Sequence, residues 1–199
     1  MATDFMEQRV LLLISYILLM VLLLVANSCG SGADGINSNT FRVRMDDKGF
    51  NQRGELLYYH NKPFTGLSYG LFANGDTARF CQFTNGKQNG LLKWYYPNRQ
   101  LAQLRFFSDG KKVGIHKGWW DDGTPKFEYH LVNDEYEGEL KEWFRTGKLA
   151  RLFHYKAGHE EGSEKMWWED GKIRANYVII NGEKFGLFGQ KLCVNIVKK

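Results

Sequence analysis

The chain has 199 residues, of which 43% are hydrophobic and 15% aromatic, and it carries a formal net charge of +5 at pH 7. This composition excludes a disordered chain and suffices for one modest folded domain. Glycine is abundant, with 22 residues, whereas proline is scarce, with 3. This balance favours many short strands separated by glycine turns over a helical fold.

The N-terminal segment is an apolar run, Val10 to Ala26, that follows a single basic residue, Arg9. As a helix it would extend about 25 Å, which is at the short end for crossing a hydrocarbon core of roughly 30 Å. We therefore expect residues 1–29 to be a targeting or anchoring segment, either a cleaved signal peptide or a retained membrane helix.

The residues after this run resemble a bacterial lipoprotein signal, in which small residues precede a cysteine and a flexible polar tether follows it. Here the sequence VANS precedes Cys29, and GSG follows it. The resemblance implies that Cys29 is lipidated and that the protein is exported and membrane-associated, facing the periplasm or the cell surface. We favour a lipoprotein over an uncleaved anchor helix, and both interpretations tether the chain to a membrane.

A repeat of 24 residues organises the rest of the chain. The first set of glycines with this spacing is Gly66, Gly90, Gly114, Gly138, Gly162 and Gly186. The second set is Gly75, Gly123, Gly147 and Gly171, and the third is Gly86, Gly110, Gly158 and Gly182. Pairs such as Asn85-Gly86 flank runs of five to eight aromatic-rich residues, a pattern typical of β-hairpins. Each repeat is therefore predicted to form two short antiparallel strands.

We predict an all-β fold, an elongated antiparallel β-meander of 24-residue hairpin repeats, preceded by an N-terminal hydrophobic helix. The expected domains are the signal or anchor at 1–29, a flexible linker and lead-in strand at 30–53, and the repeat domain at 54–199. Each hairpin packs mainly on its neighbours in such an array. Cys81 and Cys193 lie nearly five repeats apart, at about 9.6 Å per repeat, so we expect them to stay unpaired.

The repeat units GLLKWYYPNRQLAQLRFFSDGKKV and GELKEWFRTGKLARLFHYKAGHEE resemble the variant MORN (membrane occupation and recognition nexus) repeat. The resemblance covers roughly residues 54 to 190. It is close to the YwqK family, whose members are described as antitoxins of toxin–antitoxin systems. This resemblance implies a protein that binds other proteins and has no catalytic activity.

Paired aromatic residues recur within each repeat. Counting the first glycine set as position one, positions six and seven hold Leu71-Phe72, Tyr95-Tyr96, Trp119-Trp120, Trp143-Phe144 and Trp167-Trp168. Neighbouring residues of a strand point to opposite faces, so one column lines each face of the sheet. We expect the better packed face to carry Leu92, Trp94, Tyr96, Trp120, Leu140, Phe144, Met166 and Trp168.

A ladder of lysines accompanies the other aromatic column. Lys93, Lys117, Lys141 and Lys165 recur every 24 residues, two residues before Tyr95, Trp119, Trp143 and Trp167. These eight residues are the candidate binding site, because they are predicted to form a ribbon of cationic and π groups with about 9.6 Å between repeats. An alternative is that the lysines solubilise the face and guard strand edges, while the tryptophans pack against the adjoining strand.

The predicted function is a non-catalytic, membrane-tethered scaffold that binds another protein, such as a toxin or an envelope protein, as an antitoxin or immunity protein. One alternative is contact with anionic lipid headgroups, which the basic charge also fits. Another is binding of cell-wall carbohydrate or choline, because KWYYPN and KGWWDDG resemble the aromatic hairpin repeats of choline- and glucan-binding modules. We expect no binding of nucleic acid, since the sequence contains no recognised motif for it.

We expect neither enzymatic activity nor a cofactor or metal. Of the five histidines, His130 and His154 are the repeat-equivalent pair. They lie about 10 Å apart across two strands, too far to share a zinc ion without further ligands. The serines Ser68, Ser108 and Ser163 have no nucleophile elbow, and the acidic residues are scattered over turns.

Overall fold

The computed structural model describes residues 40–188, which form a 13-stranded sheet and a 3-stranded sheet. The chain divides into the units 1–40 and 41–199, and both sheets belong to the second unit. The predicted all-β meander of hairpins is therefore confirmed. The predicted hydrophobic helix, Cys29 and Cys193 lie outside the described residues. Residues 40–188 contain no helix that is long and apolar enough to cross a membrane.

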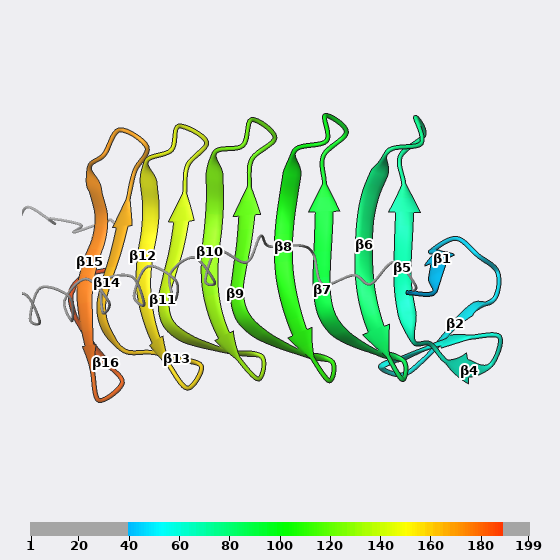
Figure 1. Cartoon of the computed structure of the whole chain (residues 1–199). Coiled ribbons are helices and arrows are strands. Elements are labelled where there is room, and N and C mark those ends of the chain that lie inside the picture. The colour runs from blue at the N-terminus through cyan, green and yellow to red at the C-terminus, as the bar shows by residue number, and fades with distance from the viewer. Residues whose placement is uncertain (1–39, 189–199) are drawn as a thin grey trace, which may run out of the picture. The chain divides into compact units, whose positions relative to one another are not determined.

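The main sheet is a meander whose strands lie side by side in chain order (Figure 1). From β5 onward, each strand pairs antiparallel with the next, and β13 pairs with β12 beside β14. The strands are β5 (Gly66–Leu71), β6 (Thr77–Thr84), β7 (Lys87–Tyr95), β8 (Leu101–Ser108), β9 (Lys111–Trp119), β10 (Pro125–Val132), β11 (Glu135–Trp143), β12 (Leu149–Lys156), β13 (His159–Glu160), β14 (Gly162–Trp167), β15 (Ile173–Ile180) and β16 (Glu183–Leu187).

Four short strands close the N-terminal end of the main sheet. They are β1 (Arg42–Arg44), which runs parallel to β5, and β2 (Phe50–Arg53), β3 (Leu56–Tyr59) and β4 (Lys62–Pro63), which form the smaller sheet. Phe64 is only 2% exposed and its ring contacts Phe41, Phe50 and Tyr59 at centroid distances of 5.0 to 6.2 Å. The segment 30–53, which was expected to be a linker with a lead-in strand, thus contributes β1 and β2.

The lower row of turns in Figure 1 consists of two-residue hairpin turns. Both residues of each turn have positive φ angles, such as 50° and 83° in Asn85-Gly86, which is the type I′ geometry that matches the twist of the flanking strands. Ala157-Gly158 adopts the same geometry, with φ 47° at the alanine. The third glycine set therefore occupies the positions that the sequence predicts.

The upper row of turns is fixed by asparagine and aspartate side chains. In four of these turns the side-chain oxygen accepts a hydrogen bond of 2.9 to 3.0 Å from the backbone N–H two residues further on. The accepting residues are Asn74, Asn98, Asp122 and Asp170. The residue after each of them lies at positive φ, and three of these four residues are glycines of the second set.

The first glycine set lies inside the strands and not in turns. In the β8–β9 pair, Leu104 faces Lys117 and Phe106 faces Val113, so one residue of β8 opposes three residues of β9. Gly114 lies in this bulge with φ 72°, and Gly90, Gly138 and Gly162 also have positive φ at the equivalent positions. Bulges bend a strand, and the strands curve near the lower turns in Figure 1.

The core lies on one face of the bent sheet. Its largest cluster consists of Leu140, Phe153, Ala175, Tyr177 and Ile179, each at most 7% exposed. Leu92, at 8%, belongs to a second cluster with Cys81 and Phe107. The burial of Leu92 and Leu140 confirms this face as the better packed one.

Two tryptophans that were expected on the packed face are exposed, and for them the expectation was wrong. Trp168 is 51% exposed and Trp94 is 38% exposed. Trp168 lies past the end of β14, at the start of a turn, and its ring contacts the Arg174 guanidinium. In the equivalent place, Arg145 from the next turn covers the ring of Trp120.

Candidate binding face

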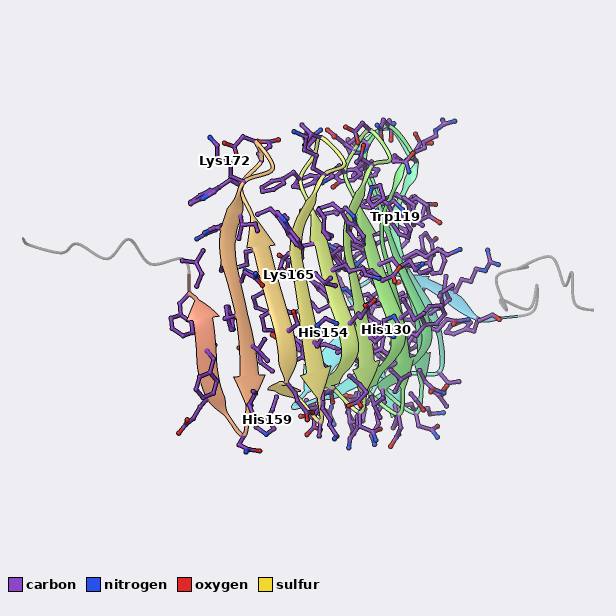
Figure 2. The ribbon with its side chains drawn as sticks, turned by 90° about the vertical axis from the view of Figure 1, so that its left-hand side faces the viewer. Trp119, His130, His154, His159, Lys165 and Lys172 are labelled. Carbon is purple, nitrogen blue, oxygen red and sulfur yellow. The ribbon has the colours of Figure 1, made fainter. Side chains whose placement is uncertain are left out.

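Strand register places the four lysines on one face of the sheet, opposite to the core. Across neighbouring strands, the Cα partners run Phe80, Lys93, Leu104, Lys117, Glu128, Lys141, Leu152 and Lys165. Because paired residues of adjacent strands point to the same side, all eight side chains share what we call the ladder face. Figure 2 shows Lys165 in the middle part of the strands, with Lys172 at one row of turns and His159 at the other.

An apolar stripe runs beside the lysines on the ladder face. We define this aromatic stripe as Tyr95, Trp119, Trp143 and Trp167 with their cross-strand partners Leu101, Pro125, Leu149 and Ile173. All four aromatic side chains are half-buried. Within residues 40–188, the three indole rings stack on no other aromatic ring. Aromatic and aliphatic groups therefore alternate along the array.

The indole N–H groups of the stripe have no acceptor in the described part of the chain. Trp119, Trp143 and Trp167 form no hydrogen bond through Nε1 with any residue from 40 to 188. An indole N–H and a lysine ammonium are both donors only. The ladder face thus carries a row of indole donors beside the row of lysines.

Carboxylates neutralise the two central lysines, so the ladder is not the uniformly cationic ribbon that the sequence suggested. Lys117 Nζ lies 2.9 Å from Glu128, and Lys141 Nζ lies 2.5 Å from Glu139. The hydrogen bond from each lysine is the main cause that lowers the pKa of its glutamate. The sequence signal for these pairs was weak, because Glu128 replaces the Leu104 of the preceding repeat.

The two outer lysines of the ladder have different surroundings. Lys93 Nζ lies 5.7 Å from the centroid of the Phe80 ring, a distance typical of a cation–π contact. Lys165 is exposed and forms no ion pair with any residue between 40 and 188. Lys165 is therefore the ladder cation that is most accessible to a ligand carboxylate.

Two histidines lie next to these lysine–glutamate pairs on the ladder face. His130 Nε2 lies 3.7 Å from Glu128, and His154 Nε2 lies 3.8 Å from Glu139 (Figure 2). Each histidine thus shares its carboxylate with a lysine. Among residues 40–188, no group of three histidine, cysteine or acidic side chains is arranged to hold a metal ion.

The closest cation–π contacts with tryptophan lie at the upper turns and involve the other member of each pair. The ring of Trp120 lies 4.4 Å from Lys126 Nζ and 5.1 Å from the Arg145 guanidinium, which also pairs with Asp121. The ring of Trp168 lies 4.7 Å from the Arg174 guanidinium. The sequence signal for these contacts was weak: Lys126 and Arg174 occupy equivalent positions two repeats apart, but the repeat between them has Ala150 there, and Arg145 has no basic equivalent in the adjacent repeats.

Three buried polar residues interrupt the core at position three of the repeat. Ser68, His116 and Glu164 are at most 2% exposed, whereas other repeats carry leucine there. Both carboxylate oxygens of Glu164 accept from the backbone N–H of His154, at 3.0 and 3.2 Å. Burial raises the pKa of Glu164 to about 7 and lowers that of His116. These side chains are buried within the sheet and are therefore not accessible to a ligand from solvent.

An open pocket of about 640 Å³ lies between the last two lower turns. Its lining includes Lys156, His159, Glu160, Glu161 and Lys184. Lys184 lies 2.8 Å from Glu160, and Lys156 lies 3.7 Å from Glu161, so the charges largely cancel. The pocket therefore has less recognition chemistry to offer than the ladder face.

Comparison with known proteins supports the type of repeat. Residues 136–157, which span most of β11, its turn and β12, match the family model of the MORN repeat variant. No curated protein matches the chain significantly. The matched segment is one hairpin of the array, with Lys141, Trp143 and Leu149 on its ladder face. The matched hairpin is therefore similar to the MORN repeat variant.

Proposed function

We propose that this chain is a non-catalytic scaffold, tethered to a membrane through residues 1–29, that binds another protein on its ladder face. The observation that carries the proposal is the aromatic stripe, which runs across four repeats with half-buried rings and unused indole donors. Tryptophan and tyrosine are enriched at the energetic centres of protein interfaces. An antitoxin or immunity role, with a toxin or an envelope protein as the partner, fits such a surface.

The charge of the ladder face favours a protein over anionic lipid as the partner. Basic segments bind anionic membranes with about 1 kcal/mol per lysine or arginine near the surface. Lys117 and Lys141 are already paired with glutamates, so their contribution to such binding is reduced. The exposed Lys165 alone gives little membrane affinity. The ion pairs do not weaken contacts between the aromatic stripe and a protein partner.

Photo-crosslinking in the intact cell tests the proposal. A photoreactive phenylalanine analogue is placed at position 143 of the full chain, on the ladder face, or at position 94, an exposed tryptophan on the opposite face of β7. We expect a discrete protein adduct from position 143 and none from position 94. Adducts of equal yield at both positions, or none at either, would contradict binding on the ladder face.

A vesicle assay separates the lipid alternative. The full chain in detergent is reconstituted with neutral vesicles, and these are tested for clustering with added anionic vesicles. We expect no clustering beyond that of neutral vesicle controls. Clustering that Lys165→Gln abolishes, together with the absence of a protein adduct, would assign the face to lipid headgroups.

A further inference from the structure

We propose that the partner segment on the ladder face is an acidic, proline-rich peptide in the polyproline II conformation. It crosses the strands and advances one turn per repeat, along the aromatic stripe. This inference rests on the proposed function, because it specifies which kind of protein segment the face accepts. Three properties of the face carry it: the spacing of the rings, the excess of donors and the distribution of charge.

The spacing of the rings matches polyproline II better than an α-helix. Equivalent side chains of successive repeats lie two strands apart, about 9.6 Å. A polyproline II turn of three residues advances about 9.3 Å, whereas seven residues of an α-helix advance about 10.5 Å. Over the three intervals from Tyr95 to Trp167, the mismatch is about 0.9 Å for polyproline II and about 2.7 Å for the helix.

An extended strand fails for a different reason. Three residues of a strand advance about 9.9 Å, but residues three apart point to opposite sides. Every second contact would therefore point away from the stripe. In polyproline II, residues three apart lie on the same side, so each turn presents an equivalent side chain to successive rings.

The hydrogen-bonding groups of the face also fit this conformation. Trp119, Trp143 and Trp167 present indole N–H groups that no residue from 40 to 188 accepts. A polyproline II segment makes no internal hydrogen bonds, so its backbone carbonyls are free to accept. The carbonyls inside an α-helix are already bonded within the helix. Proline also removes backbone N–H groups, which would find few acceptors among these rings.

The charge of the face favours an acidic residue at the Lys165 end of the segment. The carboxylates beside the stripe, Glu128 and Glu139, are held by Lys117 and Lys141. Lys165 has no such partner among the described residues. An acidic residue of the segment can therefore pair with Lys165, whereas the charges of Lys117 and Lys141 are already compensated. A segment that already has the polyproline II conformation also loses less conformational entropy when it binds an aromatic groove.

Calorimetric titration of the full chain in detergent micelles tests the inference with peptides of two to six Pro-Pro-Glu triplets. We expect affinity to rise with each triplet up to four, the number of aromatic rungs, and then to level off. A peptide of five Gly-Gly-Glu triplets keeps the charge but lacks the stiff conformation, so we expect it to bind at least tenfold more weakly. Equal affinity for the glycine peptide, or tighter binding of an acidic α-helical peptide, would overturn the proposal.

Matched tryptophan variants locate the peptide. We expect Trp143→Ala to weaken binding of the five-triplet peptide about tenfold, as for a residue at the centre of an interface. Trp94→Ala removes an exposed tryptophan from the other face and should leave the affinity unchanged. An equal loss in both variants would refute docking on the ladder face. If position 143 crosslinks a cellular protein but no proline peptide binds, only this inference fails. If neither occurs, the proposed function fails as well.

Discussion

Glu164 makes the stability of this fold depend on pH, and Glu164→Gln should remove that dependence. The side chain of Glu164 is 0% exposed, and burial is the main cause that raises its pKa from the ordinary 4.5 to about 7. The folded chain therefore binds a proton more tightly than the unfolded chain does. Its contribution to stability is full below pH about 4.5 and is lost as the pH rises through about 7.

The magnitude follows from the two pKa values. A tenfold difference in proton affinity corresponds to about 1.4 kcal/mol, so Glu164 lowers the free energy of unfolding by about 3 kcal/mol between pH 4 and pH 8. Glutamine stays neutral and can still accept the hydrogen bond from His154. We therefore expect the difference in unfolding free energy between Glu164→Gln and the parent chain to grow by about 3 kcal/mol in favour of the variant over this range.

Urea unfolding followed by tryptophan fluorescence at pH 4, 6 and 8 measures this difference. Glu169→Gln is the matched control, because Glu169 is an exposed carboxylate in the turn that follows β14. This variant should keep the pH dependence of the parent chain. If Glu164→Gln and the parent lose stability in parallel as the pH rises, then Glu164 does not hold its proton in the fold and the reasoning is refuted.

Four further experiments test the turns, the bulges and the cysteines. Ala157→Asn should stabilise the chain by about 0.5 to 1 kcal/mol in urea unfolding, because alanine is strained at φ 47° and asparagine tolerates it; an unchanged midpoint would contradict this. Gly138→Ala should cost about 1 to 2 kcal/mol from backbone strain alone, since φ is 75° and nothing lies within 4 Å of the added Cβ; a tolerated alanine would argue against the bulge. Burial raises the pKa of Cys81 to about 12, so peptide mapping after iodoacetamide treatment at pH 8 should find it alkylated in urea only; labelling of the folded chain would show that it is accessible. Cys29→Ser should abolish incorporation of a fatty-acid analogue, and persistent labelling would favour an anchor helix.

The hairpin architecture could be predicted because it is encoded locally and repeated. At the lower turns the Asn-Gly and Asp-Gly pairs specify type I′ turns, and the alternation of side chains along a strand fixes which residues share a face. Lys117 and Trp119 share a face because they lie two residues apart in β9. The period of 24 gives Lys141 and Trp143 the same placement in β11. The other repeats also indicate where a turn lies when its own signal is weak. Asn133-Asp134 lacks glycine and still forms the expected turn.

The parts that escaped prediction depend on residues that do not repeat. Glu128 occupies a position that carries leucine in the two adjacent repeats, and its carboxylate pairs with Lys117. The first glycine set has the same period as the turn glycines, so spacing could not show that it lies in bulges. The exposure of Trp168 and Trp94 differs from that of Trp120, whereas a periodic pattern treats all repeats as equivalent.

The two ends of the main sheet differ, and this sets the order in which the hairpins should come apart. At one end, β1 pairs with β5 and Phe64 is almost fully buried. At the other, every residue of β16 is exposed, and within the described residues the strand pairs with β15 alone. In arrays of this kind each unit is held by its neighbours only. The sheet should therefore unfold locally from the β16 end. Amide protons should exchange with solvent fastest in β16 and slowest in the central hairpins.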